Sequence, residues 1–191
     1  MLNIKTLLPI ISIFFIGCGA GEGPTNTTPA KNPSDVLKIS QNEILTAINK
    51  ARNEVRDCND GLGIVGPVQP LTWNTNLYAS AYEHSNDLAQ SNTFSHDGSG
   101  TDSDTTGSNN GNRSLYYERI EANGYVEYRA VGENIAGGQE NIDDVMNAWL
   151  ESPLHCQNIM SKEFSEVGVA IVVNEASDYQ IYWTQNFGDK K

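Results

Sequence analysis

Two histidines and one glutamate are the residues of this 191-residue chain whose side chains best suit metal binding or proton transfer. His96 lies in "FSHDG", Glu133 in "GENIAGG" and His155 in "SPLHCQN". Two imidazoles and one carboxylate are an ordinary ligand set for Zn²⁺ with an open position. His96 is expected after one helix, Glu133 at the start of the "GENIAGG" segment and His155 after another helix, so all three lie at element ends, where sites are usually built. Two hypotheses stay open: the three converge on Zn²⁺ or another divalent metal, or each histidine only hydrogen-bonds locally and an organic ligand binds without metal.

The first seventeen residues have the layout of a secretory signal, which implies export. "MLNIKTLLPIISIFFIG" places one lysine ahead of an apolar run, and that run is short for a membrane span of about 20 residues. The following "FIGC" resembles the bacterial lipobox, in which Cys18 is acylated, although Phe15 departs from the usual leucine. A plain secretory signal with an incidental Cys18 is the alternative. Residues 18–38, rich in Gly, Pro, Thr and Asn, predict a flexible tether before a domain at 39–191.

Export makes a disulfide the default state of the two remaining cysteines, Cys58 and Cys156. Free thiols are the alternative. Cys156 follows His155 directly, but neighbouring side chains diverge by about 100° on a helix and point to opposite faces of a strand. Adjacency therefore argues against a catalytic Cys–His pair.

The charge of the chain limits its partners. Its formal net charge is −12, and removal of residues 1–17 takes away only Lys5. Neutralising phosphates requires clustered lysine and arginine, whereas here they are scattered. We therefore expect no nucleic-acid partner and no membrane contact except through the lipid anchor. A small molecule, a lipid or a protein remains as the expected ligand.

Apolar spacing predicts helices early in the chain and paired strands late. One helix is expected to end near Cys58, with Ile44, Ile48, Ala51 and Val55 on its buried face. A second follows an Asn74 cap and a third, "NIDDVMNAWLE", ends at Pro153. "EVGVAIVV" and "YQIYWTQNF" alternate like two strands of a hairpin. This order predicts an α+β fold with an antiparallel sheet covered by helices.

Two further features favour structural interpretations. His84 lies within the second helix and is expected to be a packed or surface residue rather than a ligand. Residues 95–114 contain no core-forming side chain and are expected to be a solvated insertion. They hold the start of a calcium-loop pattern, but its twelfth position, where a glutamate is needed, is Arg113. The positions that match that pattern are Asp102, Asp104, Thr106 and Gly107.

Six motifs in order resemble the bacterial branch of the CAP family, also called SCP-like or cysteine-rich secretory proteins. They are "LTWNTNLYASAYEHSNDLAQSNTFSHDG", "ERIEANGY", "VGENIAGG", "AWLESPLHCQNIM", "EVGVAIV" and "YWTQNFG". The resemblance covers about residues 42–188. It implies a three-layer α-β-α sandwich with a central antiparallel sheet.

The resemblance also implies a surface cavity lined by two histidines and two acidic residues. By motif, these are His96, His155 and Glu133, while the fourth position is Ser152 instead of an acid. That departure leaves the fourth cavity residue in doubt. The "HCQNIM" motif further supports the pairing of Cys156 with the cysteine that follows the first helix.

Membership of this family does not by itself settle an activity, because its members are described as sterol or lipid binders, signalling proteins, metal binders and proteases. No serine or threonine here has a recognisable nucleophile setting, so catalytic residues stay unknown. We expect a binding or interaction module. The alternatives are a metal-dependent hydrolase, with His96 and His155 holding Zn²⁺ and Glu133 as ligand or base, and a structural component of the cell envelope.

Overall fold

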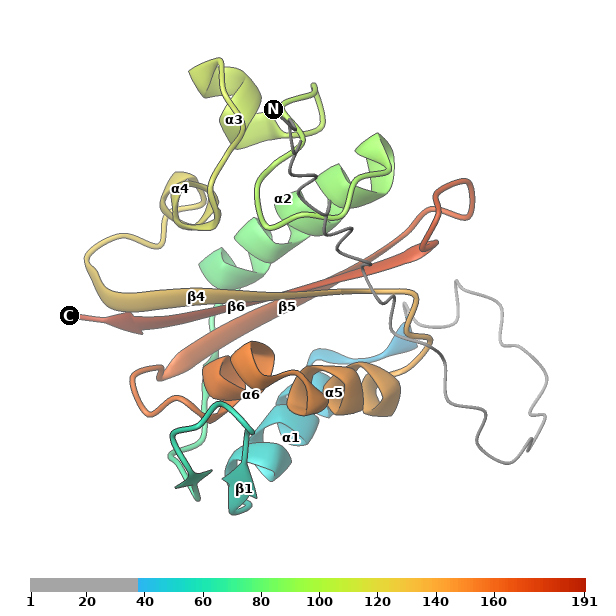
Figure 1. The fold of residues 1–191 in the computed structure, drawn as a ribbon. Helices are drawn as coiled ribbons and strands as arrows, with labels where there is room; N and C mark the ends of the chain where they lie inside the picture. Colours follow the sequence, from blue (N-terminus) through green and yellow to red (C-terminus); the bar gives the residue numbers. More distant parts are fainter. Residues whose placement is uncertain (1–37) are drawn as a thin grey trace, which may run out of the picture. The chain divides into compact units, whose positions relative to one another are not determined.

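The computed structural model describes residues 38–191, which form helices on both faces of a four-stranded sheet (Figure 1). The predicted signal segment, Cys18 and nearly all of the tether lie outside the described residues. The elements are α1 (Gln41–Arg52), β1 (Arg56–Asp57), β2 (Ile64–Val65), β3 (Thr72–Trp73), α2 (Thr75–Ser91), α3 (Thr105–Asn110), α4 (Tyr116–Ala122), β4 (Tyr128–Gly137), α5 (Ile142–Glu151), α6 (Pro153–Met160), β5 (Glu166–Val173) and β6 (Ile181–Lys190).

The sheet has the strand order β3-β5-β6-β4, so β4 is an edge strand. β6 pairs antiparallel with both β5 and β4 over most of its length. β3 adds two residues in parallel to β5, which makes the sheet mixed. A two-stranded antiparallel hairpin of β1 and β2 stands apart from it.

Helices form the outer two layers. α2, with α3 and α4 beside it, covers one face of the sheet, and α1, α5 and α6 cover the other (Figure 1). The buried stripe of α5 meets the sheet through Trp149, whose ring lies edge-on to Trp183 with centroids 6.5 Å apart. The prediction of a three-layer α-β-α sandwich is confirmed. The sheet was predicted to be antiparallel throughout, and β3, which pairs in parallel with β5, was not predicted.

α1 ends six residues before Cys58, earlier than its apolar spacing predicted. Val55 is 63% exposed, so it does not continue the buried face. Arg52 instead closes the helix, with a buried guanidinium that donates to the carbonyls of Ile159 and Ser161 at 2.6 and 2.8 Å. The spacing of apolar residues could not predict this end of the helix, because Arg52 is a charged residue whose partners are backbone carbonyls of a distant segment.

Pro153 ends α5 as predicted, but it also begins a further helix that the sequence analysis missed. Ser152 separates the two, and Pro153 occupies the first turn of α6, where a missing N–H costs nothing. His155 and Cys156 therefore lie on a helix. Cys156 forms the expected disulfide with Cys58, which links the β1–β2 hairpin to α6.

Residues 95–114 are more ordered than a solvated insertion. The buried carboxylate of Asp104 caps α3 and accepts from the N–H groups of Gly100, Gly107 and Ser114. These hydrogen bonds outweigh the burial that opposes ionisation, so the pKa of Asp104 is lowered. Asp102 is exposed. Asp104, one of the positions that match the calcium-loop pattern, thus holds the segment together by accepting hydrogen bonds from its backbone.

Within residues 38–191, no helix combines the length and apolar character that a membrane crossing requires.

Candidate functional site

The site is built on the edge strand β4, which the sequence analysis did not identify as a strand. Glu133 and Asn134 are consecutive in the middle of β4, so their side chains point to opposite faces of the sheet. Glu133 faces the layer of α2 and α4, and Asn134 faces α6. Two adjacent polar residues can therefore act on both outer layers at once.

The carboxylate of Glu133 is buried and has a partner on each oxygen. Its Oε2 accepts from Nη2 of Arg119 at 2.9 Å, and its Oε1 accepts from Nδ1 of His96 at 3.0 Å. Arg119 also donates to the carbonyl of His96 at 2.9 Å, so it holds both the carboxylate and the histidine backbone. Asn186 lies directly opposite Glu133 on β6. In the orientation of its amide that satisfies both the nitrogen and the oxygen, the nitrogen donates to Oε2 of Glu133 at 3.2 Å.

Glu133 stays ionised despite its burial. Burial is the largest influence and raises the pKa, but neighbouring positive charge and hydrogen bonds outweigh it, so the pKa of Glu133 is lowered. Among those neighbours His84 would act only when protonated, which its own burial opposes. At neutral pH the stabilising contributions that remain are the charge of Arg119 and the hydrogen bonds from Arg119 and His96.

His84 is the third imidazole of this cluster, and it is fully buried. Its Nε2 lies 2.9 Å from the carbonyl of Ser95 and 3.8 Å from Oε1 of Glu133. A carbonyl only accepts, so Nε2 carries the proton and Nδ1 is left without a partner among residues 38–191. Burial lowers the pKa of His84 and keeps it neutral. Of the two positions expected for His84, packed or at the surface, the structure has the packed one.

His96 and His155 meet beyond the outer edge of β4. His96 follows α2 on one face of the sheet and His155 lies on α6 on the other, yet their ring centroids are 6.4 Å apart. The side chain of His96 is 49% exposed, and His155 is half-buried. Since a carboxylate only accepts, the proton of neutral His96 is on Nδ1, which leaves Nε2 free to bind.

Asn134 holds the second histidine by its backbone, whereas Glu133 holds the first by its ring. Its amide nitrogen donates to the backbone carbonyl of His155 at 3.1 Å, and its oxygen accepts from Asn158 at 2.8 Å. Asn158 also donates to the carbonyl of Glu133, which covers part of the free edge of β4. Burial, and the charge that His96 carries when protonated, lower the pKa of His155, so its imidazole is neutral at neutral pH.

Ser152 lies half-buried between α5 and α6, three residues before His155. Its hydroxyl makes no hydrogen bond within the described part of the chain, and its carbonyl accepts from the N–H of Cys156. The structure thus brings together His96, Glu133 and His155, with His84, Arg119 and Asn134 as residues that sequence reasoning did not assign to the site.

The donor set suits a weak, two-histidine metal site better than a three-ligand site. Within residues 38–191, no group of three or more His, Cys, Asp and Glu side chains is arranged to hold a metal ion. Two imidazoles that share a tetrahedral Zn²⁺ at about 2.0–2.1 Å have centroids about 5 Å apart. The rings of His96 and His155, at 6.4 Å, would have to approach by a small side-chain rotation. Glu133 would orient His96 from behind, as carboxylates commonly do for metal-binding histidines.

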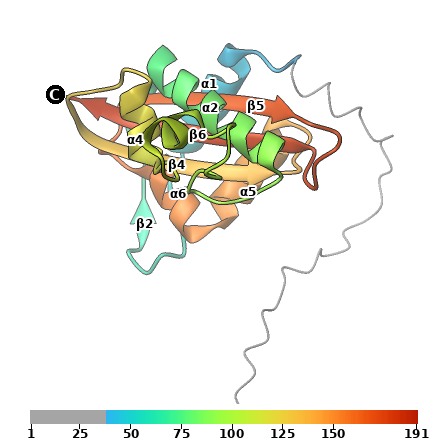
Figure 2. The same ribbon diagram turned by 90° about the horizontal axis from the view of Figure 1, so that it is seen from above.

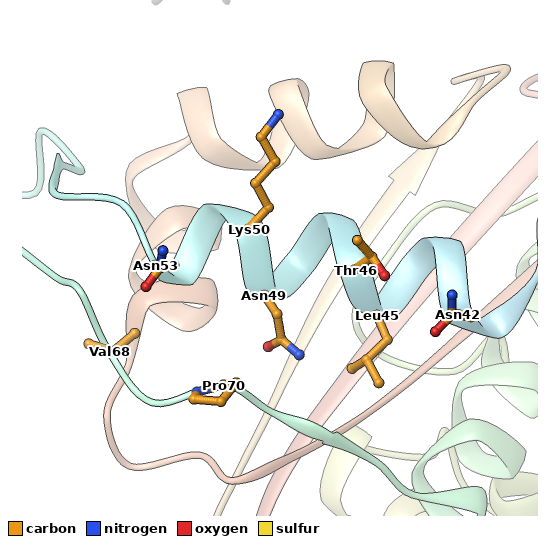
Figure 3. A pocket seen from close by; sticks show the side chains of 8 residues that line it. All are labelled: Asn42, Leu45, Thr46, Asn49, Lys50, Asn53, Val68 and Pro70. Atoms are coloured by element: carbon orange, nitrogen blue, oxygen red, sulfur yellow. The ribbon is translucent and has the colours of Figure 1, made fainter.

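Hollows of measurable volume lie elsewhere on the domain. One of about 580 Å³ runs beside α1 (Figure 3), where Asn49 points toward the segment of Val68 and Pro70 and hydrogen-bonds the backbone of Leu71. Another of about 550 Å³ separates the β1–β2 hairpin from the end of α6. In Figure 2 that hairpin stands away from the sheet. Neither hollow is lined by His96, Glu133 or His155.

Residues 45–187 match the CAP family, described as the cysteine-rich secretory protein family. The uncharacterized protein YkwD of Bacillus subtilis is 32% identical over 120 residues, which are 63% of this chain and 40% of that protein. The uncharacterized membrane protein YlbC of the same organism is 25% identical over 137 residues, 72% of this chain and 34% of that protein. The chain therefore matches well under half the length of these curated relatives.

Solved structures share the fold. An outer surface protein from Borrelia burgdorferi superimposes with a TM-score of 0.57 at 20% identity, over 84% of this chain and 97% of that one. An extracellular protein containing an SCP domain from Bacillus anthracis gives 0.56 at 24% identity, over 86% and 45% of the two chains. At these identities the likeness supports the arrangement of elements alone.

Proposed function

Since the chain belongs to the cysteine-rich secretory protein family, we propose that it is an exported binding or interaction module whose site is the His96–His155 pair. The observation that carries the proposal is the hydrogen bond from Nδ1 of His96 to the buried carboxylate of Glu133. It sets the tautomer of His96 and leaves Nε2 outside that bond, on a ring whose centroid is 6.4 Å from that of His155. The half-exposed imidazole of His96 is therefore fixed in one orientation and can accept a metal ion or a hydrogen-bond donor on Nε2.

The pair would hold a divalent metal ion such as Zn²⁺ through Nε2 of His96 and a ring nitrogen of His155. The remaining coordination positions would be open to the ligand, and the metal would supply a positive charge for a carboxylate, phosphate or carbonyl of that ligand. The lowered pKa of His155 favours the neutral imidazole that a metal requires. Without metal, the same two imidazoles would hydrogen-bond a polar group of an organic ligand.

A hydrolase is the less favoured function. A metal-assisted hydrolase would need a carboxylate free to take a proton from water. Both oxygens of Glu133 are engaged by Arg119 and His96, and its pKa is lowered, which makes it a poor base. Glu133 therefore suits a positioning role.

The test is a calorimetric titration with Zn²⁺ at neutral pH. We expect about one ion per chain, with binding lost in His96→Ala and in His155→Ala. Glu133→Gln should weaken binding by about 10- to 100-fold, because an amide has one accepting oxygen and cannot accept from both His96 and Arg119 as the carboxylate does. Asp102→Asn is the matched control, since Asp102 is exposed and belongs to the calcium-like pattern. No Zn²⁺ binding, or binding that both histidine substitutions leave unchanged, would contradict the metal site.

We also propose that the protein is exported and anchored by lipid on Cys18. The support is the signal layout of residues 1–17, the "FIGC" motif, and the disulfide, which persists in oxidising compartments. The similar proteins of Borrelia and Bacillus anthracis are described as an outer surface protein and an extracellular protein. Mass spectrometry of protein from its native host should find acylated Cys18 as the first residue. An unmodified Cys18 within a longer N-terminus would refute the anchor.

The ligand of the proposed site is a small molecule, a lipid or a protein, and contact with a membrane would come through the anchor alone. A purely structural component of the cell envelope would instead show stable partners in pull-downs and no saturable ligand uptake.

A further inference from the structure

A hollow of about 510 Å³ lies over the solvent-facing side of α2, away from the histidine pair. Its walls come from α2, from the segment that begins α3, and from the end of α4. The residues that line it are Tyr78, Ala79, Tyr82, Glu83, Asn86, Ser103, Thr105 and Asn123.

Aromatic rings form a row along this side of α2. Tyr78 and Tyr82 are one helical turn apart and remain 42% and 50% exposed. Their centroids are 6.5 Å apart, and the ring of Trp73 extends the row at 5.8 Å from Tyr78. A single exposed tyrosine is ordinary, but adjacent rings beside a hollow offer a surface on which an apolar ligand face can pack.

Apart from the carboxylate of Glu83, the polar groups of the hollow are neutral, and some of them make no hydrogen bonds. The amide of Asn86 and the hydroxyl of Thr105 make no hydrogen bonds within residues 38–191. Each of these groups can donate and accept. No lysine or arginine lines the hollow.

The walls are held in place by Glu83. Its Oε1 accepts from the N–H of Thr106 at 2.7 Å, and its Oε2 accepts from Nδ2 of Asn123 at 2.7 Å. These bonds tie α2 to α3 and α4, so a ligand would meet a surface that is already ordered. They also occupy the only carboxylate of the lining, which leaves it a poor partner for a cation.

We propose that this hollow binds a neutral oligosaccharide. A sugar ring has an apolar C–H face that packs on aromatic faces, here Tyr78 and Tyr82, and a rim of hydroxyls that pair with groups able to donate and accept. Asn86 and Thr105 supply such groups. An acidic polysaccharide is disfavoured, because the lining holds no cation and the chain carries a net charge of −12. This site is separate from the His96–His155 pair, and its test does not depend on that of the metal.

The test is an NMR titration of the ¹⁵N-labelled protein with three neutral oligosaccharides: chitotetraose, cellotetraose and maltotetraose. At least one should shift the amide signals of α2 around Tyr78–Asn86, with a Kd of about 1 mM or tighter, as expected for a shallow site. Tyr82→Ala should weaken that binding by about five- to tenfold, the loss expected for one stacking contact, and Tyr82→Phe should retain most of it. Tyr179→Ala is the matched control, because Tyr179 is 44% exposed and lies outside the hollow.

A tyrosine pair that only stabilises the helix, by about 0.2–0.5 kcal/mol, predicts a different result. In that case Tyr82→Ala would lower the free energy of unfolding slightly, and no sugar would shift the α2 signals. Absence of shifts with all three sugars at about 10 mM would overturn the proposal. Shifts that Tyr78→Ala and Tyr82→Ala leave unchanged, or tighter binding of an acidic oligosaccharide, would overturn it as well.

Discussion

Glu133 and Arg119 form a buried ion pair on which the position of His96 depends. Both side chains are about 1% exposed, and their closest atoms are 2.9 Å apart. A buried charge that loses its partner is strongly destabilising, whereas loss of both partners together costs less. Single and double substitutions of Glu133 and Arg119 can therefore separate what the pair contributes to stability from what it contributes to the site.

Arg119→Met should lower the free energy of unfolding by about 3–5 kcal/mol, because it leaves the carboxylate of Glu133 buried without its cation. The double variant Arg119→Met/Glu133→Gln should recover part of that loss. Urea denaturation of the two single variants and the double variant gives the coupling free energy directly. Strictly additive effects would show that the pair does not act as a unit.

The buried His84 makes stability depend on pH. Burial lowers its pKa in the folded state, whereas in the unfolded state it titrates near its usual value of about 6.5. Above that pH both states are neutral and folding is favoured. As the pH falls below about 6.5, only the unfolded state gains the proton, so the free energy of unfolding decreases by up to about 1.4 kcal/mol per pH unit for each such group.

The protein should accordingly be less stable at pH of about 5 than at about 7.5. The difference should shrink in His84→Gln, which cannot titrate. His155→Gln should remove a smaller share, because His155 is only half-buried and its pKa is lowered by burial in the same direction. Urea denaturation at both pH values measures these differences. A pH dependence that His84→Gln leaves unchanged would contradict the burial of a neutral imidazole.

Residue types and motifs predicted that His96, Glu133 and His155 lie close together, and they do, but not which of them contacts which. His84 lies at helical spacing from Leu77, Ala81 and Leu88, which is a signal for the buried face of α2. Its proximity to Glu133 of β4 has no counterpart in local sequence. Arg119 gave no usable signal either, because a buried arginine on a short helix looks like a surface residue.

At the scale of elements, the strongly periodic segments were predicted and the polar ones were not. The stripe of α5 follows from burial of one helix face. β5 and β6 were predicted from their apolar alternation, although helices cover both faces of the sheet and the first eight residues of β6 are all buried. β4 was missed because Gly132, Glu133 and Asn134 interrupt its apolar residues with polar groups that other segments satisfy. In β4, the polar residues in the middle of the strand, Glu133 and Asn134, are those that contact the candidate site.

One glycine determines how closely α2 approaches the sheet. A Cβ on Gly168 of β5 would lie 2.1 Å from the backbone nitrogen of Tyr78 and 2.4 Å from the carbonyl carbon of Leu77. Backbone atoms of a packed helix cannot move aside as a flexible side chain does. Gly168→Ala should therefore force α2 away from β5.

We expect Gly168→Ala to lower the free energy of unfolding by about 3 kcal/mol, the upper part of the range for overpacked cores. Chemical denaturation checks this value, and amide exchange should show the loss of protection concentrated in α2 and β5. Since α2 positions the segment that carries His96, binding at the site should weaken as well. An alanine variant as stable as the parent would show that α2 does not pack so closely against β5.

At the scale of the whole domain, the sandwich brings the two histidines together from opposite layers. α2 and α6 cover different faces of the sheet. His96, which follows α2, and His155, in the first turn of α6, can therefore meet only beyond an edge strand. β4 is that edge, and Glu133 and Asn134 anchor one histidine each from its two faces. The Cys58–Cys156 disulfide holds the helix that carries His155 to the segment after α1. The site is therefore a product of the tertiary fold, which local sequence patterns do not encode.

The most direct test of this account is a crystal structure of the protein soaked with Zn²⁺, with anomalous data collected at the zinc edge. We predict one anomalous peak between His96 and His155, about 2.0–2.1 Å from Nε2 of His96, with Glu133 still bonded to Nδ1 and outside the coordination sphere. A peak at another place, a peak coordinated directly by Glu133, or no peak between the two rings would contradict it.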